Sequence, residues 1–240
     1  MNNALPKRPL ALMNWSGGKD SALALHRIRQ QDQFTVPALL TTVNRALGRV
    51  SMHGVRQELV QAQADRLGVP LLQLALPEET TATDYARQMA ATLAPWVAAG
   101  VTHAVFGDLF LEDLRIWREE QLRQVGLSGV FPLWKTNSVA LLEEFWNAGF
   151  QTVVVAVNGQ VLDRSFCGRL LDRQFVADLP PGVDPCGENG EFHTFVFDVP
   201  YFAHPIPFAR GETVGRTYQF TDAAGAPQTT TYYFTDLLPA

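Results

Sequence analysis

The clearest chemical signal in this sequence is a short polar segment, Ser16-Gly17-Gly18-Lys19-Asp20-Ser21. An apolar run long enough for a buried strand precedes it at residues 10–13, and apolar residues at helical spacing follow at Ala22, Leu25 and Ile28. The segment is therefore predicted to leave a strand and open a helix. Two adjacent glycines let the backbone curl, and the first amides of a helix have no partners inside it. Such a ring of N–H groups is suited to an anion such as phosphate.

Two simpler interpretations of this segment remain. Asp20 or Ser21 could merely cap the helix, and the Lys19 side chain could point to solvent. The segment is not a Walker A loop, because the Gly-x-x-x-x-Gly-Lys-Ser/Thr spacing is absent. Since the complete Ser-Gly-Gly-Lys-Asp-Ser string is uncommon, we predict that it binds the phosphates of a nucleotide.

A second polar cluster lies late in the chain, where Glu188, Glu191 and His193 fall within six residues around Asn189-Gly190. Asn-Gly favours a tight turn, and the spacing alone favours an exposed hairpin tip, because Glu-x-x-Glu-x-His is not a specific metal motif. His193 could equally be an ordinary strand residue. Cys186 is a potential nucleophile, but the sequence places no base beside it, and most such cysteines are inert.

The composition is that of a protein that folds without disulfide bonds or structural metals, and it lacks the features typical of nucleic-acid-binding or membrane proteins. Its 240 residues are 47% hydrophobic and 18% charged, with a net charge of −5 and no Lys/Arg-rich run. The two cysteines make neither a disulfide framework nor a metal quartet, and no apolar run reaches membrane length. Residues 1–9 are polar and interrupted by proline, so no secretion signal is expected. We expect a soluble, cytoplasmic protein with no membrane or nucleic-acid partner.

The elements that must position these groups alternate between strand and helix over residues 1–150. This alternation predicts an α/β fold with a doubly wound parallel sheet, covered by helices on both faces. Ligands of such sheets lie beyond the carboxyl ends of the strands, where polar loops are predicted at Ser16–Ser21, Asn44–Gly54 and Gly107–Arg118. The predicted strands are residues 10–13, 36–43, 70–76, 101–106 and 130–133, and the predicted helices include 55–67, 81–99 and segments around Trp117 and Phe145.

The pattern changes after Phe150, where strands dominate and glycine and proline become frequent. We divide the chain into a nucleotide-binding domain, residues 1–150, and a smaller C-terminal α+β part, residues 151–240. The second part is expected to act as a substrate-binding region or lid. Its predicted elements are strands 150–157, 195–199, 214–220 and 229–234, a helix over 168–177 and a turn at 222–227.

Several segments, in this order along the chain, resemble the diphthine–ammonia ligase family, which belongs to the N-type ATP pyrophosphatases. The resemblance covers roughly residues 8–208. The Ser16–Ser21 loop is shared by the whole superfamily, whereas Gly187–Thr194, which reads Gly-Glu-Asn-Gly-Glu-Phe-His-Thr, is more particular to this family. The other matching segments are Gly107-Asp108, Pro132-Leu133-Trp134, and Leu162-Asp163 with Gly168-Arg169.

The resemblance implies the strand order 3-2-1-4-5, in which the first and fourth strands are neighbours. Asp108, at the carboxyl end of the fourth strand, would then face the phosphate loop. A carboxylate beside bound phosphate usually has a metal ion between them, because bare anions repel. We therefore expect Asp20 and Asp108 to hold Mg²⁺; the alternative is that Asp108 is a helix N-cap or turn residue.

The resemblance also implies an ATP-dependent ligase that forms AMP and pyrophosphate. A carbonyl oxygen, or a carboxylate of a small molecule or a protein side chain, would be adenylated, and ammonia or an amine would then displace AMP. Arg115 and Arg118 are candidates for stabilising charge, and a homodimer is a further expectation. The expected ATP-binding residues are Ser16, Gly17, Gly18, Lys19, Asp20, Ser21, His53 and Gly107, and the expected catalytic residues are Asp20, Asp108, Glu188, Glu191 and His193.

Two positions depart from the pattern of archaeal and eukaryotic family members. Those tend to have glycine at the position of Asn189 and glutamate at that of His193, and the form found here is more similar to bacterial relatives. The adenylating chemistry is therefore expected to transfer, and diphthine as the substrate is not. Nucleotide hydrolysis by water and a non-catalytic ATP- or AMP-sensing module stay as alternatives.

Overall fold

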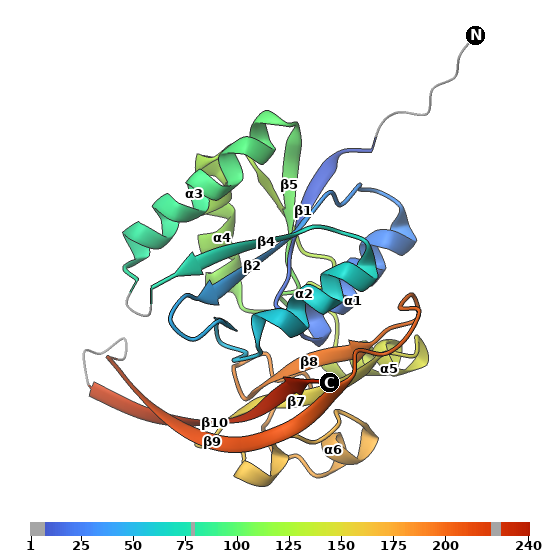
Figure 1. Cartoon of the computed structure of the whole chain (residues 1–240), viewed down its shortest axis with the longest axis vertical. Coiled ribbons are helices and arrows are strands. Elements are labelled where there is room, and N and C mark those ends of the chain that lie inside the picture. Colours follow the sequence, from blue (N-terminus) through green and yellow to red (C-terminus); the bar gives the residue numbers. More distant parts are fainter. Residues whose placement is uncertain (1–7, 78–79, 222–226) are drawn as a thin grey trace.

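The computed structural model describes residues 8–77, 80–221 and 227–240. Their strands form two sheets, and the second sheet lies across one end of the first (Figure 1). The strands of the first sheet are β1 Leu10–Asn14, β2 Leu39–Asn44, β3 Arg49–Val50, β4 Leu71–Leu76, β5 Val101–Val105 and β6 Ser128–Val130. Five of them are parallel in the order β4-β2-β1-β5-β6, and the short β3 pairs antiparallel with β2. The predicted doubly wound sheet is thus confirmed, with β1 and β5 side by side.

Helices cover both faces of this sheet because successive residues of β1 point to opposite sides. Ala11 and Met13 belong to a core that includes residues of α1 and α2, whereas Leu12 belongs to a second core with residues of α3 and α4. A strand buried on both faces has to be apolar throughout, which explains the run Leu-Ala-Leu-Met. The helices are α1 Lys19–Gln31, α2 Gln57–Leu67, α3 Ala82–Ala98 and α4 Glu112–Gln124.

The second sheet is antiparallel, in the order β8-β7-β10-β9, and lies across the carboxyl ends of the first (Figure 1). Its inner core is continuous with that of α1 and α2, since one apolar cluster contains Ala22, Val60, Val154 and Phe195. The remaining elements are α5 Ser138–Asn147, β7 Gln151–Asn158, the 3-10 helix η1 Arg164–Phe166, α6 Arg173–Ala177, β8 Phe192–Asp198, β9 Phe208–Thr221 and β10 Pro227–Pro239.

Three predictions of element position were wrong. The strand expected at 130–133 is β6, Ser128–Val130, and a turn follows it. The helix expected over 168–177 is only α6, because Leu170 bridges to Val153 of β7 and Asp172 caps the helix by accepting from the Phe175 amide at 2.8 Å. The strand expected from Phe195 starts at Phe192, which places His193 on β8.

Other differences are smaller. The second strand starts at Leu39 rather than at residue 36, and the expected polar loop 44–54 contains β3. The two C-terminal strands are longer than predicted, and the turn expected at 222–227 lies outside the described residues except for Pro227. In the described part of the chain, no helix is both long and apolar enough to cross a membrane.

Candidate active site

The Ser16–Ser21 loop leaves β1 and opens α1, as predicted. Gly17 has a φ of +79°, a conformation that suits glycine. Its carbonyl accepts hydrogen bonds from the backbone amide of Val196 and from the side-chain amide of Gln63, both at 2.9 Å. The loop is therefore docked on β8 of the second sheet, and its geometry depends on both halves of the chain.

Gln63, in the middle of α2, connects three separate segments. Its side chain is fully buried, and its amide nitrogen donates to the carbonyls of Gly17 and Val196, at 2.9 and 2.6 Å. Its amide oxygen accepts from the indole of Trp15 at 2.8 Å. Sequence reasoning missed Gln63, although a polar side chain on the apolar stripe of an amphipathic helix is the signal that could have found it.

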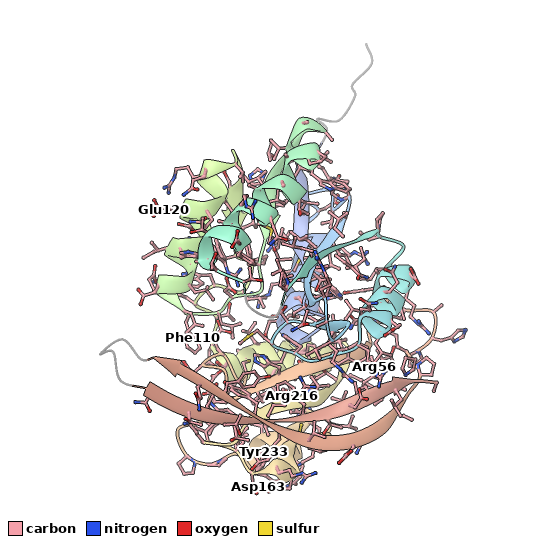
Figure 2. All side chains as sticks on the ribbon, turned by 60° about the vertical axis from the view of Figure 1, so that its left-hand side comes forward. Arg56, Phe110, Glu120, Asp163, Arg216 and Tyr233 are labelled. Carbon is pink, nitrogen blue, oxygen red and sulfur yellow. The ribbon has the colours of Figure 1, made fainter. Side chains whose placement is uncertain are left out.

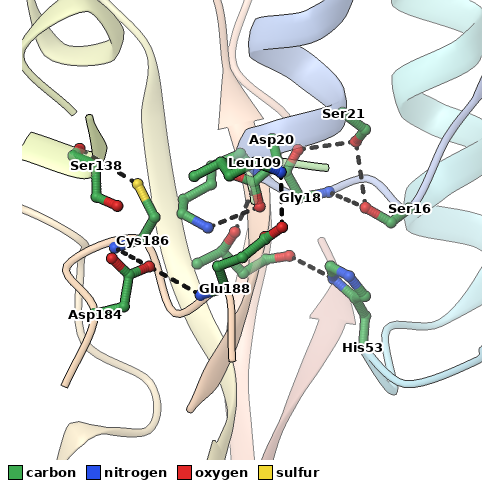
Figure 3. Close-up of polar contacts among 12 residues, drawn as sticks. Ser16, Gly18, Asp20, Ser21, His53, Leu109, Ser138, Asp184, Cys186 and Glu188 are labelled. Carbon is green, nitrogen blue, oxygen red and sulfur yellow. Dashed lines mark hydrogen bonds and ion pairs between the residues drawn. The ribbon is translucent and has the colours of Figure 1, made fainter. Parts of the chain in front are cut away.

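Hydroxyl groups already satisfy part of the loop backbone (Figure 3). The Gly18 amide donates to the Ser16 hydroxyl at 3.3 Å, and the Ser21 hydroxyl donates to the Gly18 carbonyl at 2.9 Å. The Lys19 amide donates to the hydroxyl of Thr194 on β8 at 3.0 Å. A side-chain oxygen therefore stands where a phosphate oxygen could be bound.

The Lys19 side chain is buried, with only 5% of its surface exposed, so the expectation that it could point to solvent is wrong. Its ammonium lies 2.8 Å from a carboxylate oxygen of Asp20 and 5.5 Å from the ring centre of Phe192. Burial lowers the pKa of Lys19, but its interaction with Asp20 outweighs this effect and raises the pKa overall. The Lys19 side chain is therefore a buried cation paired with Asp20.

Gly107 and Asp108 face the first turn of α1, since β1 and β5 are adjacent. A Cβ added to Gly107 would lie 2.7 Å from the backbone carbonyl carbon of Asp20, so only glycine allows this approach. Asp108 pairs with Arg118 of α4, whose Nε lies 2.8 Å from Oδ2. Burial raises the pKa of Asp108, and Arg118 opposes that rise.

Glu188 brings the late polar cluster to the same place. Its carboxylate accepts from the Leu109 amide at 2.7 Å, which ties this segment to the loop after β5 (Figure 3). Burial, with repulsion from Asp20, raises the pKa of Glu188 to about 7. Asp184 orients the segment, because its carboxylate accepts from the amides of Cys186 and Glu188 at 3.1 and 3.0 Å.

Glu191 is buried, with 6% of its surface exposed, so the exposed hairpin tip suggested by spacing alone is wrong. One carboxylate oxygen accepts from the Asp184 amide at 3.1 Å and from the Asn189 side chain at 2.9 Å. The other, Oε2, is buried and has no hydrogen-bond partner among the described residues. Cys186 is buried, and burial raises the pKa of its thiol to about 12, which disfavours the nucleophilic thiolate.

Two histidines join the cluster to the loop. The rings of His53 and His193 lie 4.7 Å apart between centres, and His53 Nδ1 hydrogen-bonds with the Thr194 carbonyl at 3.0 Å. A Cβ added to Gly18 would lie 2.7 Å from Cε1 of His53, so this histidine covers the loop. Burial lowers the pKa of His53 to about 4 and that of His193 well below its ordinary value, so both are neutral at pH 7.

The predicted metal ligands Asp20 and Asp108 come to the same edge of the sheet, and each raises the pKa of Glu188 by repulsion. The described residues contain no group of three or more His, Cys, Asp or Glu side chains that could hold a metal ion. Two carboxylates nevertheless fit Mg²⁺, which takes oxygen ligands and is commonly bound by one or two carboxylates plus substrate phosphates.

Arg115, a predicted charge-stabilising residue, is engaged elsewhere. It pairs with Glu119 one helical turn along α4 at 2.9 Å, and its guanidinium lies 4.8 Å from the ring centre of Phe131 and 4.6 Å from that of Trp134. These contacts pack α4 against the turn after β6. Arg118 is the arginine of α4 that reaches the candidate site.

A cavity of about 1280 Å³ opens beside this site, between the carboxyl ends of β2 and β4 and one face of β9 and β10. His193 and Arg118 form part of its wall, so it is continuous with the polar cluster. The cavity was not predicted, because its walls come from segments far apart in the sequence.

Comparisons with known proteins agree with this arrangement. The family model of the diphthamide synthase N-terminal domain matches residues 10–129, and that of the diphthamide synthase C-terminal domain matches residues 137–220. Diphthine–ammonia ligases of Bos taurus and Homo sapiens are 29% and 30% identical over 113 residues, which are 45% of this chain and 42% of each relative. The enzyme of Schizosaccharomyces pombe is 28% identical over 100 residues, 40% of this chain and 16% of the relative.

The matched region spans less than half the length of these curated relatives. The N-terminal family model nevertheless covers half of the present chain and includes the phosphate loop, Gly107 and Asp108. The C-terminal model includes Glu188, Glu191 and His193. On these matches, the chain belongs to the diphthine–ammonia ligase (diphthamide synthase) family.

Proposed function

We propose that this protein is an ATP-dependent, AMP-forming carbon–nitrogen ligase. The observation that carries the proposal is the convergence, at the junction of β1 and β5, of a glycine-rich helix-opening loop with Asp20, Asp108 and Glu188. The helix-opening loop and the buried Lys19 charge suit a triphosphate, while the carboxylates suit the cation that accompanies it. His53 and Gly107 complete the cradle around the loop.

The reaction begins when a carboxylate oxygen of the acceptor attacks the α-phosphorus of ATP. The bond from this phosphorus to the bridging oxygen breaks, pyrophosphate leaves, and an acyl adenylate forms. Ammonia or an amine then attacks the acyl carbon, and AMP departs with the bonding electrons. Asp20 and Asp108 would hold Mg²⁺, which when bound neutralises charge on the phosphate oxygens.

Glu188 is suited to the second step. An attacking nitrogen acquires a positive charge and must lose a proton, and a carboxylate with a pKa of about 7 accepts it efficiently at neutral pH. We assign neutral His193 to the acceptor because it lines the adjoining cavity and its buried Nε2 has no hydrogen-bond partner in the described chain. Glu191 has one free carboxylate oxygen and holds Asp184, which in turn orients Glu188.

The names of the relatives state that they join ammonia to diphthine. Diphthine is not proposed for this chain, because Asn189 and His193 differ from the forms that archaeal and eukaryotic members tend to have. The acceptor proposed is a carboxylate of a small molecule or of a protein side chain. Ammonia reaches the site free or from a partner.

Product analysis with α-labelled ATP tests the proposal. The protein is incubated with Mg·ATP, ammonium chloride and fractions of a metabolite extract. Asp20→Asn, which should be inactive, and Asp65→Asn, a control on the surface of α2, are assayed in parallel. AMP and pyrophosphate that require both ammonium and one fraction support the ligase. AMP formed without either identifies a nucleotide hydrolase, bound ATP without turnover a sensor, and ADP overturns α–β cleavage.

A further inference from the structure

The cavity beside the candidate site exceeds the usual size of a pocket for one small molecule. Its volume is about 1280 Å³, whereas pockets for single small molecules are typically on the order of 300–1,000 Å³. One wall consists of the ends of β2 and β4, and the opposite wall is a face of β9 and β10. None of the loop residues Ser16–Ser21 lines the cavity, so a nucleotide held by that loop would leave the β9–β10 wall open to another molecule.

Strand periodicity creates this second wall. Val214, Arg216 and Tyr218 alternate along β9 and line the cavity, as do Tyr232 and Phe234 on β10, and Thr217 also contributes to its edge. Figure 2 shows Arg216 on the side of the second sheet that faces the first, whereas Tyr233 lies on the other side. Arg216 is directly opposite Tyr232 in the antiparallel register.

Arg216 supplies a free positive charge. Two other arginines line the cavity, but Arg49 pairs with Asp236 and Arg118 pairs with Asp108, each at 2.8 Å. Arg216 has no ion-pair or hydrogen-bond partner among the described residues, and of those that line the cavity only Asp236 is acidic. In a protein of net charge −5, an uncompensated cation on a cavity wall selects an anion.

Flat apolar surfaces flank this cation. Tyr218 and Tyr232 pack edge to face with ring centres 6.2 Å apart, and across the cavity Tyr85 and Trp117 have ring centres 6.1 Å apart. Aromatic walls of this kind favour a flat, weakly hydrated group on the ligand. Arg216 and the tyrosines together therefore favour a ligand that has both an anionic group and a flat apolar group.

The cavity also ends where the proposed chemistry takes place. His193 lines it, packs against His53, and His53 in turn covers Gly18 of the phosphate loop. The Tyr232 hydroxyl donates to the Gly190 carbonyl at 3.2 Å, which links this wall to the Glu188–Glu191 segment. A ligand seated on β9 and β10 would thus lie next to the segment that carries the proposed catalytic residues.

We infer that the β9–β10 wall binds the acceptor, a small organic acid with a flat apolar group and a second anionic group that pairs with Arg216. This inference rests on the proposed ligase function for the role of the ligand, but not for its binding. One carboxylate is directed to His193 and reacts, while the other is held at Arg216 and fixes the orientation. Arg216 is therefore a specificity residue of the acceptor site.

Equilibrium binding of phenylsuccinate, followed by ligand-observed NMR, tests the inference. Phenylsuccinate has a ring and two carboxylates, and 3-phenylpropionate lacks the second carboxylate. Arg216→Gln should weaken phenylsuccinate binding by roughly tenfold or more, the scale of one charge-assisted pair, and leave 3-phenylpropionate unaffected. Arg210→Gln changes another exposed arginine of β9, one outside the cavity wall; it is the matched control and should change neither.

Three results would overturn the inference. The first is that phenylsuccinate does not bind the unmodified protein. The second is that Arg210→Gln loses as much affinity for phenylsuccinate as Arg216→Gln does. The third is that Arg216→Gln weakens ATP binding, which would mean that Arg216 binds the nucleotide. Substitution of an exposed arginine should leave the fold intact, and the melting temperature checks this. Because the readout is binding, absence of AMP formation would defeat the ligase proposal and leave this result standing.

Discussion

The hydroxyl of Thr194 accepts a hydrogen bond from the backbone amide of Lys19 at 3.0 Å, across a sequence separation of 175 residues. This contact closes the phosphate loop onto β8 and satisfies an amide that no helical carbonyl can reach. Thr194→Val keeps the shape but removes the acceptor, so the free energy of unfolding should fall by about 1–2 kcal/mol. Urea unfolding measures this loss, and Thr194→Ser, which keeps the hydroxyl, should lose less; equal losses would contradict the role of the hydrogen bond.

Gly17 should tolerate no side chain if the loop binds phosphate. A Cβ there would lie 2.7 Å from Oε1 of Gln63, and φ is +79°. Gly17→Ala should weaken ATP binding by more than roughly tenfold, since about 1.4 kcal/mol of lost contact is sufficient. Gly182→Ala is the matched control, because φ is +88° but nothing lies within 4 Å of the added Cβ. Both variants should lose about 1–2 kcal/mol of folding stability from backbone strain. ATP affinity is measured by calorimetry. An unchanged affinity in folded Gly17→Ala would show that the loop is not part of the ATP site.

Glu188 should make stability depend on pH in a defined direction. Its pKa is raised to about 7 in the folded protein from an ordinary value of 4.5, so the folded state binds its proton more tightly than the unfolded state does. The resulting stabilisation is complete below about pH 4.5 and is lost as pH rises through about 7, with a slope of at most about 1.4 kcal/mol per pH unit. Urea unfolding of Glu188→Gln from pH 4.5 to 8 should show the variant gaining stability relative to the original protein. Parallel curves would mean that Glu188 titrates normally.

Glu191 is expected to serve the acceptor and not ATP. Glu191→Gln keeps the oxygen that accepts from Asp184 but removes the charge on the free oxygen. ATP affinity should be nearly unchanged, whereas amide formation should fall by roughly 10²-fold or more. Glu212→Gln, on the exposed part of β9, is the control and should behave like the original protein. Weakened ATP binding with normal turnover at saturation would contradict this division of roles.

The first sheet could be predicted because its information is local. Buried parallel strands such as Leu10–Asn14 are short apolar runs, glycine-rich turns separate them from helices, and the order follows from the family resemblance. The segment 168–177 was predicted poorly because its backbone pairs with Val153, a partner that no local pattern reveals. Strand edges also shifted wherever tertiary pairing extended an element, as at Phe192.

The residues of the candidate site could be predicted from the sequence, but the contacts between them could not. Glycines beside Ser16 and the Glu188–His193 segment stand out by residue type, whereas the bond from Leu109 to Glu188 appears only when the two sheets meet. Burial of Lys19 depends in the same way on Phe192 and Asp20. The roles assigned to these residues stay predictions that the variants above can test.

Gln63 has a consequence for how this chain can vary over evolution. One side chain there must offer two donors, to Gly17 and Val196, and one acceptor, to Trp15, at one length. Glutamate has no donor, leucine has neither function, and asparagine is one methylene shorter. Position 63 is therefore free to change only together with position 15 and the backbone at 17 and 196. Homologues that keep Trp15 and Gly17 should keep glutamine at this position, and those that replace the tryptophan should be the ones in which the glutamine is also lost.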